Sequence, residues 1–322
     1  MLWNSEMKLV KPMLAFPAKP FDSKDFLMEI KYDGTRGIAY IDKNEKMVRL
    51  LNRRGKFFEY RYPELMNLYK QVNAKRAILD GEVVVFENGK PNFYLLEERE
   101  QSENKARIEL LSKVHPAVYV VFDILHLDGK DLLEKPLIER KKVLEEVLEE
   151  SDFCINSKYI FEKGKALFKR VKKNGLEGIM AKKINSTYQQ KRSTDWLKIK
   201  ANNTIDAVII GYTTSEKEEL SALILGVYDK GKIRYIGRVG TGFDEEKKAL
   251  LLEKLKHAKK AKYEIEMSLE PGRKAFFVEP ELVAEVKYLE LTRDNILRAP
   301  SFIRLRDDKL PKECTLESQI AQ

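Results

Sequence analysis

The chain has 322 residues, of which 43% are hydrophobic and 34% charged, and its formal net charge at pH 7 is +9. The apolar fraction is that of a globular protein, which argues against disorder, and the length fits two ordinary domains or one large one. The excess of Lys and Arg favours a polyanionic partner, most simply nucleic acid, while two isolated cysteines and three scattered histidines disfavour disulfide, zinc and histidine-triad chemistry.

The sequence shows no targeting or membrane-spanning signal. Its N-terminus lacks the charged-then-apolar pattern of a signal peptide, and no apolar run approaches membrane-spanning length. We therefore expect a soluble cytoplasmic protein, associated with the nucleoid if its partner is DNA, and no membrane partner.

The first part of the chain, to about residue 200, mixes short apolar strands with helices. The predicted strands are 27–32, 36–41, 47–51, 78–86, 118–125, 178–182 and 196–200. A helix is predicted over 137–150 from its apolar stripe, and another over 164–175, ended by Asn174-Gly175 as a C-cap. The interleaving, with neighbours that look antiparallel, favours an α+β domain.

After residue 201 the pattern becomes that of a small β-structure. Strands are predicted at 204–213, 221–229, 232–240, 275–280 and 282–290. One helix is predicted to begin after Asp244, an N-cap followed by two glutamates. Five strands and one helix fit a β-barrel of the oligonucleotide-binding (OB) fold. We place the domain boundary in the polar stretch 200–204, which gives domains 1–201 and 202–322.

Charged residues share faces of several predicted strands. Because a strand alternates faces with a period of two, Glu29 and Lys31 point to one side, and Lys198 and Lys200 share a face with Trp196. Two ammonium groups so close together repel each other, which predicts an anionic ligand between them. Any one such pattern is more often only the solvated face of a sheet. Taken together, however, these patterns supply the groups needed to hold a nucleoside triphosphate and attack its phosphorus.

The order of these segments resembles that of the covalent nucleotidyltransferases. Residues 31–34 match the K-x-D-G motif of that superfamily. The other segments follow in the family's order: "NRRG" (52–55), "LDGEVVV" (79–85), "VFDIL" (121–125), "EGIMAKK" (177–183), "STDWLKIK" (193–200) and "RLRDDK" (304–309). With "KPMLA" near the start, the chain looks most like the small ATP-dependent DNA ligases of bacterial and archaeal end joining. Asn52 stands where the family usually has Ser, and Arg53 keeps the matching position.

The resemblance implies a fold and a three-step reaction. The fold is a nucleotidyltransferase (ATP-grasp-like adenylation) domain with antiparallel sheets, followed by an OB-fold domain. Lys31 would attack the α-phosphorus of ATP to form lysyl-AMP, the AMP would pass to a 5′-phosphate at a nick, and the 3′-hydroxyl would then displace it. A free lysine amine is mostly protonated at neutral pH, so Lys198, Lys200 and a bound metal ion are expected to favour its neutral form and to stabilise the phosphate charge.

The resemblance also assigns residues to the base and the ribose. Glu29 would read the adenine and Phe122 would stack on it. Arg53 and Glu82 would hold the ribose or its surroundings, and Glu82 is also a candidate metal ligand.

The remaining assignments concern phosphate and metal. Arg36 and Arg192 would meet ribose or phosphate. Glu177 is the first candidate to contact Mg²⁺ (or Mn²⁺), because hard cations prefer carboxylate oxygen. Arg306 and Lys309 would close over the pyrophosphate in step one, which requires the barrel domain to swing in and later to open towards DNA.

The interpretation leaves alternatives open. An RNA ligase or a GTP-dependent capping-type enzyme would use the same motifs, and a basic nucleic-acid-binding protein would use its lysines only for phosphate contacts. An NAD-dependent ligase is disfavoured because no segment for the nicotinamide end is seen. We expect a compact monomer, without the helical DNA-binding domain of larger ligases, that binds nicked duplex DNA with modest affinity and is helped by an end-binding or repair protein.

Overall fold

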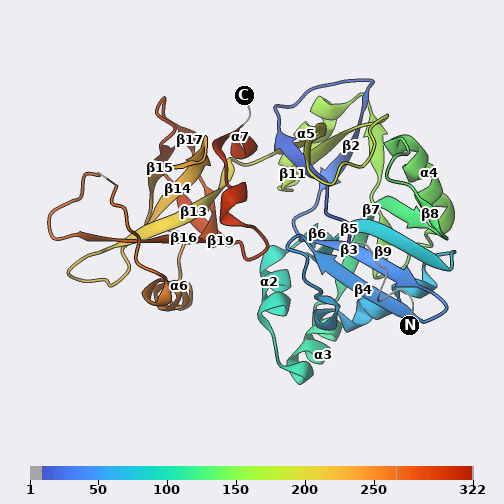
Figure 1. Ribbon diagram of the computed structural model, residues 1–322, viewed down its shortest axis with the longest axis horizontal. Coiled ribbons are helices and arrows are strands. Elements are labelled where there is room, and N and C mark those ends of the chain that lie inside the picture. Colours follow the sequence, from blue (N-terminus) through green and yellow to red (C-terminus); the bar gives the residue numbers. More distant parts are fainter. Residues whose placement is uncertain (1–8, 266, 321–322) are drawn as a thin grey trace. The chain divides into compact units, whose positions relative to one another are not determined.

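The computed structural model describes residues 9–265 and 267–320. The chain divides after Ala201 into two compact units, which are labelled by element in Figure 1. Unit 1 combines two sheets with helices, and unit 2 is a sheet with one long helix. We describe each unit by itself.

Unit 1 contains two mainly antiparallel sheets. The first has the order β1 (Leu14–Pro17), β12 (Arg192–Lys200), β11 (Gly178–Lys183), β2 (Phe26–Lys31) and β10 (Tyr159–Phe161). The second has the path β4 (Met47–Asn52), β3 (Thr35–Asp42), β5 (Arg76–Glu87), β7 (Ala117–Leu127) and β8 (Lys130–Asp131), with β6 (Lys90–Pro91) on β5 and β9 (Cys154–Asn156) on β7. All seven strands predicted in this part of the chain are confirmed, each with slightly different ends.

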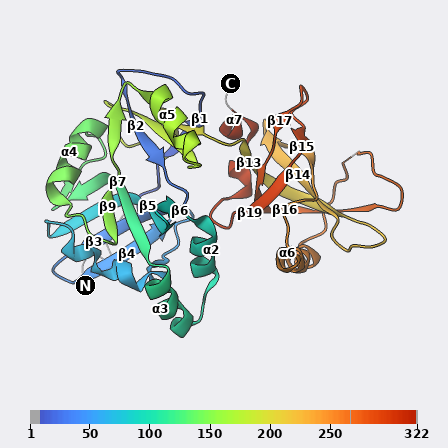
Figure 2. The same ribbon diagram turned by 180° about the vertical axis from the view of Figure 1, so that it is seen from behind.

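Helices cover the outer faces of these sheets. Helix α5 (Gly164–Lys173) lies beside β2 and β11, and α4 (Leu137–Val147) lies beside β7, as Figures 1 and 2 show. The remaining helices are η1 (Glu59–Arg61), η2 (Pro63–Lys70), α2 (Phe93–Gln101) and α3 (Lys105–Val114), which the sequence did not predict. Between the two sheets, Ile38 and Phe122 of the second sheet share a core with Trp196 of the first.

The ends of the two predicted helices have local causes. Helix α4 stops at Val147, short of the predicted residue 150, because Leu148 is extended and bridges to Val72. Helix α5 ends as predicted: Asn174 is the C-cap, and Gly175 has φ +70°, which a glycine adopts without strain. The Gly175 amide then donates to the Lys172 carbonyl at 3.1 Å.

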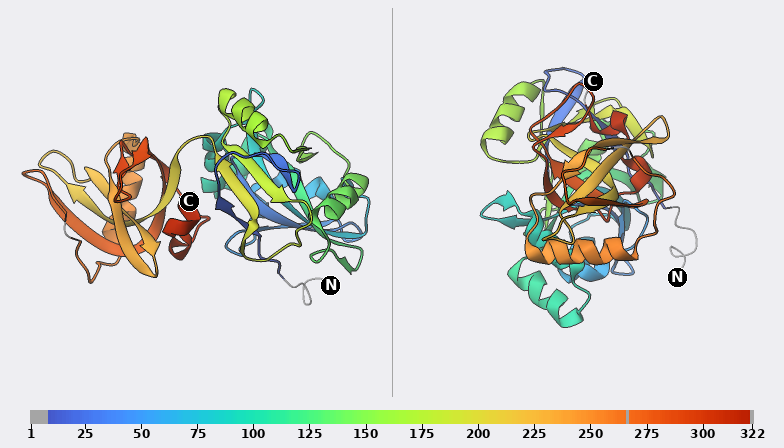
Figure 3. Two further views of the ribbon diagram at one scale, coloured as in Figure 1. Left: turned by 90° about the horizontal axis from the view of Figure 1, so that it is seen from above. Right: turned by 90° about the vertical axis from the view of Figure 1, so that its left-hand side faces the viewer.

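Unit 2 is a five-stranded antiparallel sheet that curls on itself (Figure 3). Its order is β15 (Lys232–Val239), β14 (Ala222–Asp229), β13 (Thr204–Thr214), β16 (Lys274–Lys287) and β19 (Ser301–Leu305). The hairpin β17 (Glu290–Leu291) and β18 (Leu297–Arg298), helix α6 (Glu245–His257), η3 (Pro311–Glu313) and α7 (Leu316–Gln319) complete the unit. Just beyond β15, the Thr241 carbonyl accepts a 2.9 Å hydrogen bond from the Phe302 amide of β19, so the two sheet edges approach each other.

The strand assignment in unit 2 needs one correction. Segments 275–280 and 282–290, predicted as two strands, form the single strand β16. Its register on β13 shifts between Phe277 and Leu282, and Pro280 lies in that irregular stretch, where a missing amide hydrogen is tolerated. The fifth strand of the sheet is β19, in a segment that the sequence analysis treated only as a source of cations. Helix α6 begins as predicted, with the Asp244 side chain accepting from the Lys247 amide.

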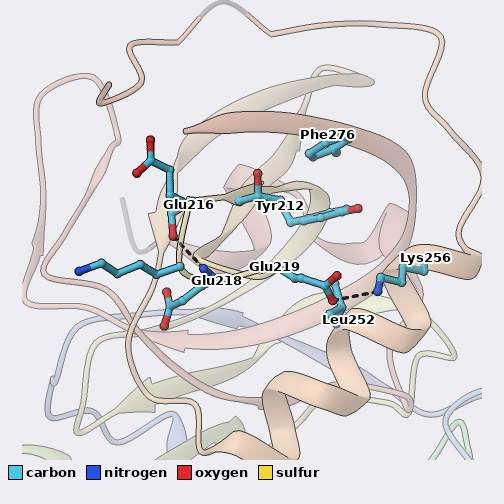
Figure 4. A pocket seen from close by; sticks show the side chains of 10 residues that line it. Tyr212, Glu216, Glu218, Glu219, Leu252, Lys256 and Phe276 are labelled. Carbon is cyan, nitrogen blue, oxygen red and sulfur yellow. Dashed lines mark hydrogen bonds and ion pairs between the residues drawn. The ribbon is translucent and has the colours of Figure 1, made fainter. Parts of the chain in front are cut away.

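Unit 2 also has a surface pocket of about 370 Å³ (Figure 4). Tyr212 and Phe276 stack on one side with ring centroids 5.3 Å apart, and Lys256 pairs with Glu219 on another. The ten lining residues are Tyr212, Thr214, Ser215, Glu216, Lys217, Glu218, Glu219, Leu252, Lys256 and Phe276. None of the site residues predicted from the sequence is among these ten. Within the described residues, no helix is long and apolar enough to span a bilayer.

Candidate functional site

The predicted cationic face is a regular cross-strand array on the first sheet of unit 1. Gly178 of β11 lies opposite Lys31 of β2 on one side and Lys200 of β12 on the other. Two residues along, Met180 lies between Glu29 and Lys198 in the same way. Because side chains in register share a face, these rows lie on one side of the sheet, as strand alternation predicted. Met180 packs into the core between the two sheets, so this face is turned towards the second sheet.

Lys31 forms an ion pair with a carboxylate that precedes the neighbouring strand. Its Nζ donates to Oε2 of Glu177 at 2.6 Å, and the two side chains are 24% and 17% exposed. The Glu177 carbonyl accepts from the Ala201 amide at 2.8 Å, which fixes the backbone of this residue beside the end of β12. Both groups remain partly exposed and within reach of a ligand.

Two glycines allow the strands around Lys31 to approach closely. A Cβ atom on Gly34 would lie 2.3 Å from the Val83 carbonyl oxygen and 2.8 Å from Cγ of Glu82. A Cβ atom on Gly178 would lie 2.2 Å from the Ile199 carbonyl oxygen. No side chain fits at either position without moving backbone. The turn that follows Lys31 therefore packs directly against β5 beside Glu82.

Arg36 is held by a carboxylate of the neighbouring strand. Its Nε and Nη2 donate to the two oxygens of Asp80, each at 2.5 Å, and its Cζ lies 4.5 Å from the centre of the Phe122 ring. Tyr188 donates to the same carboxylate at 2.6 Å. Burial alone would lower the pKa of Arg36, but Asp80 outweighs it and raises the pKa above its usual value. Arg36 is thus a permanently charged, oriented group that covers part of the predicted stacking ring.

Glu29 lies deeper than the sequence suggested. Its side chain is 2% exposed, and its two oxygens pair with Lys182, at 2.6 Å, and with Lys141 of α4. The Lys182 ammonium lies 4.1 Å from the centre of the Phe122 ring and 4.3 Å from that of Trp196. Burial, together with the charge of Lys141, lowers the pKa of Lys182 to about 8, although Glu29 opposes this.

Sequence reasoning missed Lys141, Lys182 and Asp80 as members of the site. Lys182 was visible at the end of the "EGIMAKK" strand, where alternation places it on the face of Met180. Lys141 was visible too, because it follows Leu137 by four residues and precedes Leu144 by three, which places it on the apolar stripe of the predicted helix. Here it is 0% exposed.

The other site residues predicted in unit 1 lie on strands of both sheets or in the turn after β4. Glu82 faces Arg36 across the β3–β5 ladder, and Phe122 is 8% exposed in the core between the sheets. Arg53 is half-buried in the turn after β4. Arg192, at the start of β12, donates to the Ala15 carbonyl and lies over the Phe16 ring, eight residues along the strand from Lys200.

Arg306 and Lys309 belong to unit 2, where both contact Asp206. The distances are 3.0 Å from Arg306 Nη1 and 2.6 Å from Lys309 Nζ. The Arg306 guanidinium also binds Asp308 through Nε and Nη2. Both cations are thus held within unit 2.

The arrangement in unit 1 defines a class of protein. Unit 1 provides the groups that covalent nucleotidyl transfer requires: a part-exposed lysine beside a carboxylate, two further lysines on the same face and an aromatic ring. A curled five-stranded unit follows in the chain. A family model described as the ATP dependent DNA ligase domain matches residues 12–200, and one described as the ATP dependent DNA ligase C terminal region matches residues 216–309. The chain belongs to the ATP-dependent DNA ligase family, and it is an enzyme of that type.

Similar proteins agree with this assignment. The multifunctional non-homologous end joining protein LigD of Mycolicibacterium smegmatis is 34% identical over 98% of this chain, and a DNA ligase of Thermococcus fumicolans is 31% identical over 98%. The chain spans 40% and 59% of those two proteins. A solved structure described as mycobacterial DNA ligase D complexed with ATP and MES is 29% identical, with a TM-score of 0.64, covering 95% of this chain and 98% of that one.

These comparisons confirm the predicted fold class and family. Unit 1 is the ligase nucleotidyltransferase domain, with mixed α+β structure and antiparallel sheets, and unit 2 is the OB-fold domain, a curled half-barrel. The resemblance to ligases of bacterial end joining is confirmed as well.

Proposed function

We propose that this chain seals 5′-phosphate/3′-hydroxyl nicks in duplex DNA through a covalent AMP adduct on Lys31. The observation that carries the proposal is the 2.6 Å pair between Lys31 and Glu177, on the sheet face that also carries Lys198 and Lys200. Both members of the pair are partly exposed, as a reacting group and its partner must be.

Step one transfers AMP from ATP to the lysine. The Lys31 ammonium loses a proton to solvent, and the neutral amine attacks the α-phosphorus. A P–N bond forms, the P–O bond to pyrophosphate breaks, and the nitrogen releases a second proton to solvent. The nearby charges of Lys198 and Lys200 stabilise the negative charge that grows on the α-phosphate. If one oriented cation supplies about 3–4 kcal/mol, its loss costs roughly a hundredfold or more in rate.

The Glu177 carboxylate, which pairs with Lys31, is also of the type that binds a divalent cation. It is 17% exposed, and hard cations such as Mg²⁺ prefer oxygen ligands. Among the residues that the structure describes, no three or more His, Cys, Asp or Glu side chains gather as a metal site. Mg²⁺ or Mn²⁺ would therefore be held by Glu177, with Glu82 as a further candidate, together with substrate phosphates and water. When bound, the ion would neutralise phosphate charge.

The same face offers groups for the nucleoside. We assign Phe122 to stacking on the adenine and Glu29, held by its two lysines, to the edge of the base. Arg53 and Glu82 are assigned to the ribose and its surroundings. Arg36 and Arg192, each anchored through part of its guanidinium, are assigned to ribose or phosphate contacts.

Steps two and three act on DNA. The AMP passes from Lys31 to the 5′-phosphate, and attack by the 3′-hydroxyl then closes the strand and releases AMP. The OB-fold domain would have to change its placement between step one and these steps. With a net charge of +9 and contacts mainly to phosphates, binding should weaken with salt and depend little on sequence. We further propose that the enzyme acts as a monomer on nucleoid DNA, helped by an end-binding repair protein.

The test is mass spectrometry of the protein incubated with ATP or GTP. An AMP-sized adduct on Lys31 is expected with ATP, and it should be absent from Lys31→Ala. Lys183→Ala is the matched control, since this lysine of the same sheet is 50% exposed. A GMP adduct at Lys31 would instead indicate a capping-type enzyme, and normal sealing by Lys31→Ala would overturn the catalytic assignment.

A second measurement identifies the polymer. Nicked duplex DNA should be sealed faster than nicked duplex or single-stranded RNA. Faster sealing of RNA would replace the DNA ligase proposal with an RNA ligase that uses the same covalent chemistry.

A further inference from the structure

Helix α5 differs from the other helices in its charge. It carries five cations and no acidic residue in its 10 residues, whereas every other α-helix that the structure describes contains at least one glutamate. The five cations, all exposed, are Lys165, Lys169, Arg170, Lys172 and Lys173. Within the described part of the chain, none of these side chains forms an ion pair with a carboxylate. The helix therefore presents uncompensated positive charge to solvent.

The cations occupy one side of α5 because the other side is packed. Leu167, Phe168 and Val171 belong to a core that includes Met28 of β2 and Ile179 of β11. At about 100° per residue, the five cations fall within an arc of about 160° on the opposite side of the helix. The sheet thus fixes which way the cations point.

This arrangement is unfavourable for the helix on its own. Lys169 lies four residues from both Lys165 and Lys173, and like charges at that spacing destabilise a helix. Lys165 also lies in the first turn, where the helix dipole disfavours a cation, although the dipole favours the cations of the last turn. An anionic ligand along the exposed side would remove this repulsion.

Three of the cations form a row along the helix axis. Lys165, Lys169 and Lys172 span seven residues, which is about 10 Å of helix. One strand of duplex DNA carries a phosphate about every 3.4 Å of axis, so a row of this length faces about three phosphates of that strand. A lysine ammonium is a point charge on a flexible stem and can bind each phosphate without a fixed angle.

The exposed side of α5 suits phosphates better than a protein or a membrane. All residues of α5 are described, and Ala166 is the only exposed side chain among them that is not a cation. Protein interfaces usually have an apolar, often aromatic, centre, and membrane-surface helices insert an apolar face, which here is packed against the sheet. Contacts with the phosphates of a nucleic acid need neither feature.

Helix α5 leads directly to the candidate active site. Its C-cap, Asn174, lies three residues before Glu177, the carboxylate that pairs with Lys31. The Leu176 amide donates to the Val171 carbonyl at 3.1 Å, which ties this connection to the last turn of the helix. The row of cations and the Lys31–Glu177 pair are therefore joined by one short, hydrogen-bonded connection within unit 1.

We propose that α5 is a phosphate-binding surface for duplex DNA, on which Lys165, Lys169 and Lys172 contact successive phosphates of one strand beside the nick. The surface holds the substrate and takes no part in forming the AMP adduct. The inference rests on the proposed ligase function and names a part of unit 1 that binds the DNA backbone.

The experiment measures binding to a nicked duplex that lacks the 3′-hydroxyl, without ATP, at several salt concentrations. The logarithm of the binding constant falls linearly with the logarithm of salt concentration, with a slope of about 0.9 per phosphate contact. The triple variant Lys165→Gln/Lys169→Gln/Lys172→Gln should therefore flatten the slope by about 3 and bind more weakly at physiological salt. Glutamine keeps the helix propensity of lysine, and thermal unfolding checks that the fold is intact.

Lys105→Gln/Lys113→Gln/Lys142→Gln is the matched control. These lysines are exposed on α3 and α4, and their loss lowers the net charge by the same amount without removing a row. The control should keep nearly the wild-type slope. Equal flattening in both triple variants would show an effect of net charge and overturn the proposal. A wild-type slope in the α5 variant, combined with lost binding to poly-glutamate, would assign the helix to an acidic protein and would also overturn it.

The AMP adduct on Lys31 is measured in the same preparations. Adenylation needs no DNA, so the α5 variant should form the adduct at the wild-type rate. If the wild-type protein forms no adduct, the ligase proposal is wrong. If the adduct forms and the α5 variant keeps the wild-type salt slope, only the assignment of α5 is wrong.

Discussion

Two regions of the molecule gather lysines, arginines and carboxylates, and they use them differently. In the nucleotidyltransferase domain, Lys31 pairs with Glu177 at 2.6 Å, and the side chains are 24% and 17% exposed. In the OB-fold domain, Asp206 binds two cations at once, and the side chains of Asp206 and Lys309 are 5% and 2% exposed. The composition is similar, but the Lys31–Glu177 pair is accessible to a ligand, whereas the Asp206–Lys309 pair is buried.

The difference separates reacting groups from groups that hold structure. A charge that must react has few fixed partners and some contact with solvent, whereas a fully paired, buried charge contributes by fixing geometry. We call an ion pair open when its side chains are partly exposed and closed when both are buried. Mutations in open pairs of the candidate site should change the reaction rate, and mutations in closed pairs should change the free energy of unfolding.

The largest effect is expected in a closed pair of the nucleotidyltransferase domain. Asp123 and Arg140 are both 0% exposed and share two hydrogen bonds of 2.8 Å. Because Asp123→Asn leaves a buried guanidinium uncompensated, the free energy of unfolding should fall by about 3–5 kcal/mol. Denaturant unfolding measures this, with Glu98→Gln, from an exposed pair with Arg107, as the control. A loss as small as that of the control would contradict the rule.

The pH dependence of stability tests the cluster around Glu29. Burial of Lys182, opposed by Glu29 and reinforced by Lys141, lowers its pKa from the ordinary 10.5 to about 8 in the folded protein. Between these values the unfolded chain binds more protons, so this group should make stability rise with pH, by up to about 3 kcal/mol. Subtracting the curve of Lys182→Met isolates the effect, because buried tyrosines with raised pKa values, such as Tyr188, lower stability above pH 10 in both proteins. A flat difference curve would contradict it.

A rate effect is expected in the open region. Lys200→Ala should slow adenylation of Lys31 roughly a hundredfold while the folded protein remains intact, because Lys200 shares the row of Lys31 and Gly178 on the sheet face that we assign to the phosphates. Single-turnover adenylation and thermal unfolding are measured together, with Lys183→Ala as control. Equal rates in Lys200→Ala and Lys183→Ala would remove Lys200 from the site.

The smallest effect is expected at an exposed pair. Lys256 and Glu219 are 2.9 Å apart beside the pocket of the OB-fold domain, but their side chains are 53% and 72% exposed. Glu219→Gln should change the free energy of unfolding by less than about 0.5 kcal/mol, and less still in high salt. A larger loss of stability in a denaturant titration would show that the distance between the two charges, rather than their exposure, determines how much such a pair contributes to the free energy of unfolding.

Much of the nucleotidyltransferase face could be predicted because it depends on local alternation. A period of two places Glu29 and Lys31 together, and Lys198 and Lys200 together, before any strand is paired. Alternation does not show which side chain of a neighbouring strand or helix each of these residues contacts. Alternation places Asp80 on the same face as Glu82, but its hydrogen bonds to Arg36 depend on how β3 and β5 pair.

The OB-fold domain was harder to predict for a related reason. Pro280 interrupts the pattern of β16, so one strand looked like two, and the irregularity that accommodates it exists only in the pairing with β13. The segment 301–305 contains Arg304 and leads into Arg306, so it was interpreted as a source of cations and not as a strand. Its strand character depends on Glu285, a partner 19 residues earlier in the chain.

The contact between Gly34 and β5 limits how this enzyme can be redesigned. An alanine scan of residues 29–36 would ordinarily report on side chains, but at Gly34 it would report on the position of the backbone. An added methyl group has no space beside the Val83 carbonyl and would push the turn, and Lys31 three residues before it, away from β5. Attempts to move or replace Lys31, the nucleophile that we propose, should therefore keep this glycine and vary its neighbours.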